Sequence, residues 1–259
     1  MRQQEVQRKW LKIFSLSLHH KLKLASSGIR ARNFLGKFME TKNYHFKEEK
    51  TVYFVRHGES RDNILPVFQD VNSPLSDHGR AQASKVAERI AKIDFDTLIV
   101  SPLPRARETA EAITKLTGKI PEYSELFVER IKPKNINGKP HTDEEAHKLS
   151  LLWDESLHTP GIKVEDGENF DEIFARADKA LEYLANRPEK NMVVVTHGFF
   201  LRALVAKVML GGSLTRDNFQ NIKKNTKTQN TGISVMKYVN SKEGFHWKLW
   251  VFNDHAHLG

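Results

Sequence analysis

From residue 51 onward, short apolar runs alternate along the chain with segments whose apolar residues recur at helical spacing. Three runs have the β-branched or aromatic character of buried strands: Thr51–Val55, Thr97–Val100 and Met192–Thr196. Helical spacing predicts helices over Ser76–Ile93, Pro104–Leu116, Asp143–Leu157, Phe170–Asn186 and Phe199–Leu210. Two more strands are predicted over Gly232–Val239 and Phe245–Phe252, and an exposed loop over Lys132–Pro140.

Strands that alternate with helices favour a mostly parallel sheet with helices packed on both of its faces. The pattern therefore predicts an α/β fold, a three-layer α/β/α sandwich, over residues 51–259. Two cap candidates, Ser76 and Asp77, open the first helix, and Pro104 lies in the first turn of the second.

Composition excludes several classes of protein. Apolar residues make up 39% of the 259 residues and charged residues 28%, as in ordinary soluble domains. No apolar run reaches the length of about 18 residues that a membrane span needs. The chain has no cysteine, which excludes disulfides, thiolate metal sites and cysteine nucleophiles and fits a cytoplasmic protein.

The net charge of +9 is concentrated at one end of the chain. Residues 1–50 hold 12 Lys/Arg and only 4 Asp/Glu, so the remaining 209 residues are nearly neutral. A nucleic-acid-binding globule more often spreads its basic residues over a folded face. We therefore expect no nucleic-acid partner.

The basic leader, residues 1–50, admits several interpretations. A basic arm outside the folded core, without catalytic duty, is the preferred one. An organelle transit peptide has a similar composition, and an amphipathic helix would make weak contact with an anionic membrane surface. Translation from Met39 is a further alternative, and the sequence leaves these open.

Two predicted strands end in the same way, with a histidine followed by a glycine. These are Arg56-His57-Gly58 and Thr196-His197-Gly198. In open α/β sheets, ligands bind beyond the carboxyl ends of the strands, so both histidines are expected at one edge. Gly58 and Gly198 would let the backbone approach a ligand closely, and amides at a helix start favour an anion.

A third strand end leads into Ser101–Ala110 (SPLPRARETA), which places Arg105 in the first turn of a helix at the same edge. Two guanidinium groups, those of Arg105 and Arg56, could hold phosphate oxygens through paired hydrogen bonds. Arg107 points elsewhere around the helix and is interpreted as a surface residue. Together with the two histidines, these arginines predict a site for a phosphoryl group.

Four motifs in order carry a resemblance to a known family. They are RHGES at 56–60 with Asn63, PLSDHGRAQA at 74–83, SPLPRARETA at 101–110 and VVTHG at 194–198. The chain resembles the histidine phosphatase superfamily, the phosphoglycerate-mutase-like group, and specifically its branch 1, over about residues 51–257.

The resemblance implies a role for each matching residue. His57 would be the nucleophile that becomes phosphohistidine, and Asn63 would add a contact to phosphate or substrate. The phosphoryl oxygens would be bound by Arg56, Arg105 and His197. The proton donor to the leaving oxygen would be Glu129, with Glu125 as the rival and Glu122 as a more distant one.

The resemblance favours a phosphomonoesterase that acts on a small phosphorylated metabolite without a metal ion or other cofactor. Alternatives are a phosphoprotein phosphatase, a phosphoglycerate-type mutase and a binding protein with an inherited pocket. The family's mutases carry a long insertion after the second helix, whereas the corresponding segment of this chain, residues 129–138, is short. Hydrolysis is therefore preferred, with loop 131–142 and helix 143–157 as a lid over the site.

Two details near the lid remain open in the sequence. Lys132, Lys134 and Lys139 would favour an anionic substrate if they line the pocket mouth, and would be solvated otherwise. Glu168 is interpreted as part of a capping turn before the helix that starts at Phe170, with Asn169 as a tolerable cap.

Overall fold

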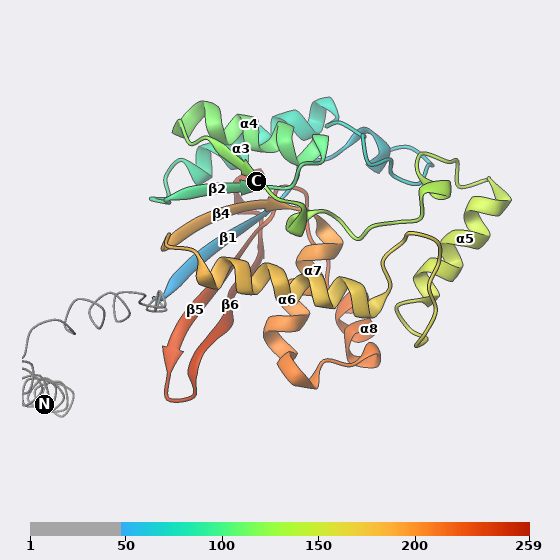
Figure 1. Ribbon diagram of the computed structural model, residues 1–259. Coiled ribbons are helices and arrows are strands. Elements are labelled where there is room, and N and C mark those ends of the chain that lie inside the picture. The colour runs from blue at the N-terminus through green and yellow to red at the C-terminus, as the bar shows by residue number, and fades with distance from the viewer. Residues whose placement is uncertain (1–47) are drawn as a thin grey trace, which may run out of the picture. The chain divides into compact units, whose positions relative to one another are not determined.

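A six-stranded sheet carries the fold, in the strand order β3-β2-β4-β1-β5-β6 (Figure 1). The computed structural model describes residues 48–259. β1 pairs in parallel with β4, β4 with β2, and β2 with β3, whereas β5 and β6 are added in antiparallel pairing. The strands are β1 (Lys50–Arg56), β2 (Thr97–Val100), β3 (Pro121–Tyr123), β4 (Asn191–Thr196), β5 (Ile233–Ser241) and β6 (Gly244–Asp254).

Helices cover both faces of this sheet, which confirms the predicted three-layer α/β/α architecture (Figure 1). The helices are α3 (Asp77–Ile90), α4 (Pro104–Thr117), α5 (Glu144–Glu155), α6 (Phe170–Asn186), α7 (Gly198–Leu210) and α8 (Arg216–Asn225). α3 and α4 pack on one face, and α6 and α7 pack on the other (Figure 1).

The central strands are apolar on both sides because each side meets a helical layer. In β1, Val52 and Phe54 belong to the core shared with α6 and α7, while Val55 belongs to the core shared with α3 and α4. In β4, Val194 and Val195 divide in the same way. Burial on both faces explains why these strands appear in the sequence as continuous apolar runs.

Two elements were not predicted from the sequence. β3 has only three residues and begins with Pro121 at the edge of the sheet, so its pattern is too short to stand out. α8 is polar apart from a few positions and buries only Phe219 fully, so its apolar face is narrow. The predicted loop Lys132–Pro140 is observed, and it contains one short 3-10 turn, Lys134–Ile136.

The basic leader lies almost wholly outside the described residues, and its interpretations stay predictions. The sheet nevertheless begins at Lys50, one residue earlier than predicted. Lys50 is buried, and its ammonium group donates hydrogen bonds to the carbonyl oxygens of Arg187 and Glu189. Within residues 48–259, no helix has the length and apolar character needed to cross a bilayer.

Candidate active site

His57 and His197 meet at the carboxyl edge of the two central strands. The parallel register pairs Arg56 with Thr196, and the His57 amide donates to the Thr196 carbonyl oxygen at 2.9 Å. The two imidazole rings have centroids 5.0 Å apart and planes inclined by 56°. Both rings are buried, with exposed fractions of 1% and 0%. Strand pairing alone thus brings together two residues that are 140 positions apart in the sequence.

His57 presents a neutral ring with one defined lone pair. Its Nδ1 lies 2.6 Å from the carbonyl oxygen of Gly58, and because a carbonyl can only accept, Nδ1 carries the proton. Burial lowers the pKa of His57 well below its ordinary value, and the charges of Arg105 and Arg56 lower it further. The ring is therefore uncharged at neutral pH, and Nε2 is the nitrogen with the free lone pair.

His197 is neutral for the same physical reasons. Burial is the largest cause of its lowered pKa, and the charges of Arg105 and Arg56 lower it further. Its Nε2 lies 2.7 Å from the hydroxyl oxygen of Ser101, at the end of β2. When that hydroxyl donates to Nε2, the ring proton is on Nδ1, which is then available as a donor.

Arg56 and Arg105 place two guanidinium groups beside the histidines. Arg56, the last residue of β1, donates from Nη1 to the Thr228 carbonyl oxygen at 2.5 Å. Arg105, the second residue of α4, is only 3% exposed. Burial lowers the pKa of Arg105 to about 10, so that it remains charged at neutral pH.

Three buried polar atoms of this group make no hydrogen bond within the described chain: Nε of Arg56, Nε of Arg105 and Nδ1 of His197. A buried donor without a partner costs about 1–3 kcal/mol, so native proteins rarely leave several together. An anion with several oxygens would satisfy such a set at once. The arrangement therefore suits a phosphoryl group placed against His57.

Glu129 is the only one of the three candidate carboxylates that the structure connects to this site. Oε1 accepts hydrogen bonds from the amides of Arg130 (3.0 Å) and Phe200 (2.9 Å), and Oε2 accepts one from Phe199 (3.2 Å). The carboxyl group thus lies at the N-terminus of α7, directly after His197. Its charge also acts on both Arg56 and Arg105.

The rival carboxylates lie elsewhere. Glu125 lines an outer groove of about 730 Å³ between residues 123–131 and α6. Glu122 pairs with Arg187 at 2.8 Å and accepts a hydrogen bond from the Tyr183 hydroxyl. Among the candidates that the sequence leaves open, the geometry therefore favours Glu129.

The glycines at the strand ends are required by close packing. A Cβ on Gly198 would lie 2.9 Å from Thr228 Oγ1 and 3.1 Å from Arg56 Nε, so glycine makes room for the guanidinium group. A Cβ on Gly58 would lie 2.5 Å from the carbonyl oxygen of Gly79 in α3. The Gly58 amide is also used within the protein, because it donates to Thr109 Oγ1 at 3.0 Å. Gly58 thus allows the close approach of α3, and its contact with a ligand stays a prediction.

Asn63 is placed less directly than the other predicted residues. It ends the 3-10 turn Arg61–Asn63, is exposed, and accepts a hydrogen bond from the Ser60 amide through Oδ1 at 3.0 Å. Its contact with phosphate or substrate stays a prediction.

Arg176 of α6 and Glu168, which lies just before that helix, form a clamp that holds the Glu129 segment, and sequence reasoning missed it. The two side chains form a buried ion pair at 2.7 Å. Arg176 also donates to the carbonyl oxygens of Leu126, Val128 and Glu129, at 2.9–3.2 Å. Glu168 accepts from the Ile131 amide at 2.9 Å.

The interpretation of Glu168 as part of a capping turn is therefore incomplete. Asn169 is the N-cap of α6, in a capping box with Glu172, and Glu168 supports the segment around Glu129 instead. One signal of the clamp was present in the sequence: Arg176 interrupts the apolar stripe of α6 between Ile173 and Ala177.

Two loops from distant parts of the chain pair beside the site. The Phe68 amide donates to the Lys139 carbonyl oxygen, the Gly138 amide to Phe68, and the His141 amide to Pro66, each at 2.9 Å. Loop 131–142 is thus bound to the loop that follows β1, and α5 continues from it beyond the edge of the sheet (Figure 1).

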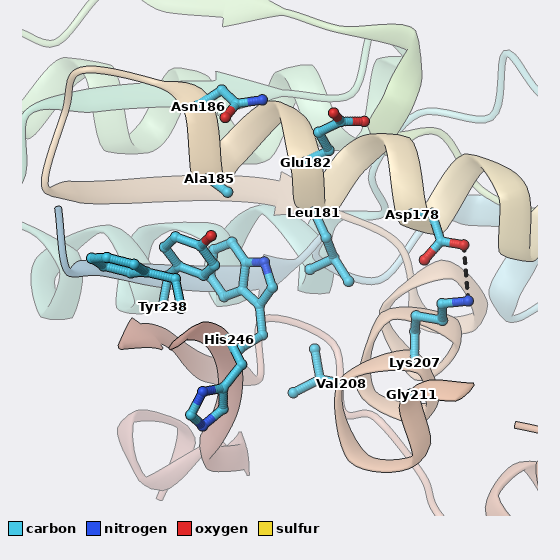
Figure 2. A pocket seen from close by; sticks show the side chains of 12 residues that line it. Asp178, Leu181, Glu182, Ala185, Asn186, Lys207, Val208, Gly211, Tyr238 and His246 are labelled. Carbon is cyan, nitrogen blue, oxygen red and sulfur yellow. Dashed lines mark ion pairs between the residues drawn. The ribbon is translucent and has the colours of Figure 1, made fainter. Parts of the chain in front are cut away.

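A cavity of about 400 Å³ lies away from these residues (Figure 2). It is bordered by the C-terminal halves of α6 and α7 and by the β5–β6 hairpin, and its wall includes the 2.8 Å ion pair between Asp178 and Lys207. None of the predicted site residues lines it. Across residues 48–259, no group of three or more histidine or carboxylate side chains is placed to hold a metal ion.

Known proteins share this sequence and this fold. The profile of the histidine phosphatase superfamily (branch 1) matches residues 52–253. A Photorhabdus laumondii protein named probable phosphoglycerate mutase GpmB is 35% identical over 164 residues, which cover 61% of this chain and 74% of that protein. A metal-independent phosphoserine phosphatase of Arabidopsis thaliana is 29% identical over 219 residues, covering 82% and 84%.

Two solved structures show the same fold at lower identity. Mycobacterial glucosyl-3-phosphoglycerate phosphatase superposes with a TM-score of 0.63 at 23% identity, over 80% of this chain and all of that one. Phosphoserine phosphatase of Entamoeba histolytica, in complex with 3-phosphoglyceric acid, gives a TM-score of 0.62 at 23% identity, over 81% and 99%. With the profile match spanning nearly all of the described residues, this chain belongs to branch 1 of the histidine phosphatase superfamily.

Proposed function

We propose that this protein is a phosphomonoesterase that transfers the phosphoryl group of a small phosphorylated metabolite to Nε2 of His57 and then releases it to water. The state of His57 carries the proposal. Its ring is buried and neutral, Nδ1 is bound to the Gly58 carbonyl oxygen, and Nε2 keeps its lone pair beside two arginines. Such a nitrogen is a nucleophile at neutral pH.

Phosphate binding would use the buried atoms that lack a partner. Arg56 and Arg105 would hold the phosphoryl oxygens through their guanidinium groups, and His197 would donate from Nδ1. Phosphoryl transfer depends mainly on positioning and on charge stabilisation, which these three side chains can supply.

The reaction then balances in two steps. In the first, the P–N bond to His57 forms, the P–O bond of the ester breaks, and Glu129 in its acid form gives its proton to the leaving oxygen. In the second, water attacks the phosphorus, Glu129 takes a proton from that water, and the P–N bond breaks. His57 returns to its neutral form and inorganic phosphate leaves.

Rapid quenching with a ³²P-labelled ester tests the intermediate. We expect enzyme-bound label that is labile to acid, stable to base and located on His57. The His57→Ala variant should bind no label and lose at least about four orders of magnitude in turnover. Full activity of that variant would contradict the mechanism.

Mutase activity is the second candidate, since several relatives are named probable phosphoglycerate mutases. The matches to those relatives cover 61–80% of this chain and the match to the phosphoserine phosphatase covers 82%, so the extent of similarity does not separate the two activities. Product analysis with a phosphoglycerate, with and without a bisphosphate primer, separates the two. Primer-dependent isomerisation faster than phosphate release would establish a mutase. If phosphate release is faster, a panel of metabolites and phosphopeptides would identify the substrate class of the phosphatase.

A further inference from the structure

Three lysines follow Glu129 in loop 131–142, and the structure separates them. Lys134 lies 3.3 Å from Asp166 and Lys139 lies 3.7 Å from Asp143, so each ammonium group faces a carboxylate. The side chains of these two lysines are 84% and 53% exposed. They are ordinary surface ion pairs, in which the charge of the lysine is already balanced.

Lys132 has a different environment. Its side chain is half-buried, and no carboxylate of residues 48–259 lies within ion-pair distance of its ammonium group. Nζ donates to the carbonyl oxygen of Gln69. Withdrawing an ammonium group from water without an opposite charge is unfavourable, so an anion that reached it would be bound well.

The position of Lys132 relates it to the active site. Arg105 donates from Nη1 to the carbonyl oxygens of Asp70 and Val71, both at 3.4 Å. Lys132 and Arg105 therefore approach three consecutive carbonyl groups of one loop, residues 69–71. Lys132 also follows Glu129, the proposed proton donor to the leaving oxygen, by three residues.

Burial and four charged groups affect the pKa of Lys132. Burial is the largest cause of its low pKa of about 8, and the positive charge of Arg105 in α4 is the next. Glu129, in the same segment, opposes this lowering, as do Asp62 in the 3-10 turn and Asp70 in the loop. The charges of Arg105 and Glu129 therefore act on the Lys132 ammonium group, although neither side chain forms an ion pair with it.

We infer that Lys132 binds a second anionic group on the leaving-group part of the substrate. The preferred substrates are then phosphomonoesters that carry a carboxylate or a second phosphate a few bonds from the reacting phosphorus. This inference rests on the proposed phosphatase function and adds a specificity-determining residue to it.

Matched pairs of esters test Lys132. O-phosphoserine and phosphoethanolamine differ by one carboxylate, as do 3-phosphoglycerate and glycerol 3-phosphate, while fructose 1,6-bisphosphate and fructose 6-phosphate differ by one phosphate. We expect the wild-type protein to prefer the more anionic member of at least one pair. The Lys132→Met variant should reduce that ratio of kcat/KM by about ten- to a hundredfold, the effect of one charge-assisted hydrogen bond.

The controls use the other lysines of the loop. Lys134→Met and Lys139→Met remove the same charge from the same loop but from balanced ion pairs, so the ratio should stay within about twofold of wild type. Lys132→Arg should keep most of the preference because it keeps the charge. Thermal denaturation of each variant distinguishes lost specificity from lost folding.

The outcomes separate this inference from the proposed function. Equal ratios in wild type and Lys132→Met, or equal losses in all three lysine variants, would overturn the role of Lys132 alone. Failure of the wild-type protein to hydrolyse any ester would overturn the proposed function itself.

The pH dependence gives a second readout. A lysine binds anions only while protonated, so the preference for 3-phosphoglycerate over glycerol 3-phosphate should fall as the pH rises through about 8. Titrating groups that affect both esters equally do not change this ratio of kcat/KM. A ratio that is constant from pH 7 to 9 would contradict the inference.

Discussion

Two regions of the chain contribute to the candidate site, and they are held in position differently. One consists of the residues at the ends of β1 and β4, and the other is segment 126–132. His57 and His197 directly follow paired central strands, and backbone hydrogen bonds of the sheet set their positions. Glu129 follows a 3-10 turn, Glu125–Phe127, beyond the three-residue edge strand β3. No regular element contains it.

Side chains replace the missing backbone support in segment 126–132. Arg176 of α6 and Glu168, just before that helix, bind its peptide groups, and the amides of α7 bind the Glu129 carboxyl group. The comparison teaches that a functional group on a strand end is positioned by the sheet, whereas one on a loop needs buried charged partners. The following experiments test that difference, beginning with the largest expected effect.

Replacing the carboxyl group of Glu129 should separate substrates by their leaving groups. In Glu129→Gln, kcat for alkyl phosphates should fall by about 10²–10⁴-fold, because the leaving alkoxide receives no proton. Aryl phosphates, whose leaving groups need no proton, should be affected far less. Glu125→Gln is the matched control, since Glu125 lines the outer groove. Equal losses for both ester classes would move the acid role to another residue.

Removing Arg176 from the clamp should reduce both the stability of the protein and proton donation by Glu129. Arg176→Met leaves the buried carboxylate of Glu168 without its partner, and we expect the free energy of unfolding to fall by about 3–5 kcal/mol in urea denaturation. Turnover of alkyl phosphates should decline more than that of aryl phosphates, because Glu129 loses its position.

Lys163→Met is the control for the clamp. Lys163 pairs with Glu172 near the start of the same helix, but both side chains are more than 40% exposed. Its loss should change stability by less than about 1 kcal/mol. A similar change in both variants would show that Arg176 and Glu168 form an ordinary surface pair.

A methyl group at Gly198 should disturb the strand-end residues most directly, because the atoms nearest to it belong to Thr228 and Arg56. In Gly198→Ala, the new Cβ meets Thr228 and the Arg56 guanidinium, so we expect about 1–3 kcal/mol of destabilisation and a raised KM. Gly212→Ala, where no atom lies within 4 Å, is the control. An unchanged KM would indicate that Arg56 is not held in place by this packing.

A further expected effect is a pH dependence of stability from the two buried histidines. Their folded-state pKa values lie well below the unfolded value of 6.5, so the unfolded chain binds more protons as the pH falls below 6.5. Stability is therefore fully present above pH 6.5 and declines below it, by up to about 1.4 kcal/mol per pH unit for each histidine.

Denaturation of the double variant His57→Gln/His197→Gln checks this decline. Its stability should vary less between pH 5 and 6.5 than that of the wild-type protein. The same slope in both proteins would show that the two rings are protonated in the folded state.

Much of the strand-end half of the site is visible in the sequence. Apolar runs that end in His57 and His197 predict one sheet edge, and Arg105 follows a third run near a helix start. The contribution of segment 126–132 is less visible in the sequence. Glu129 could be proposed from the family resemblance, with Glu125 as its rival, but only the structure shows that Glu129 lies at α7 and Glu125 in the outer groove.

The sequence by itself determined the layered fold and the strand-end residues, because periodicity of apolar positions and the residues at strand ends are local properties of the chain. Only the tertiary structure decided which carboxylate lies at the site, that Arg176 and Glu168 hold it, and that Lys132 stands apart from Lys134 and Lys139. Each of these depends on which charges meet after folding. Ion pairing and desolvation act between residues that are distant in sequence, so no local pattern records them.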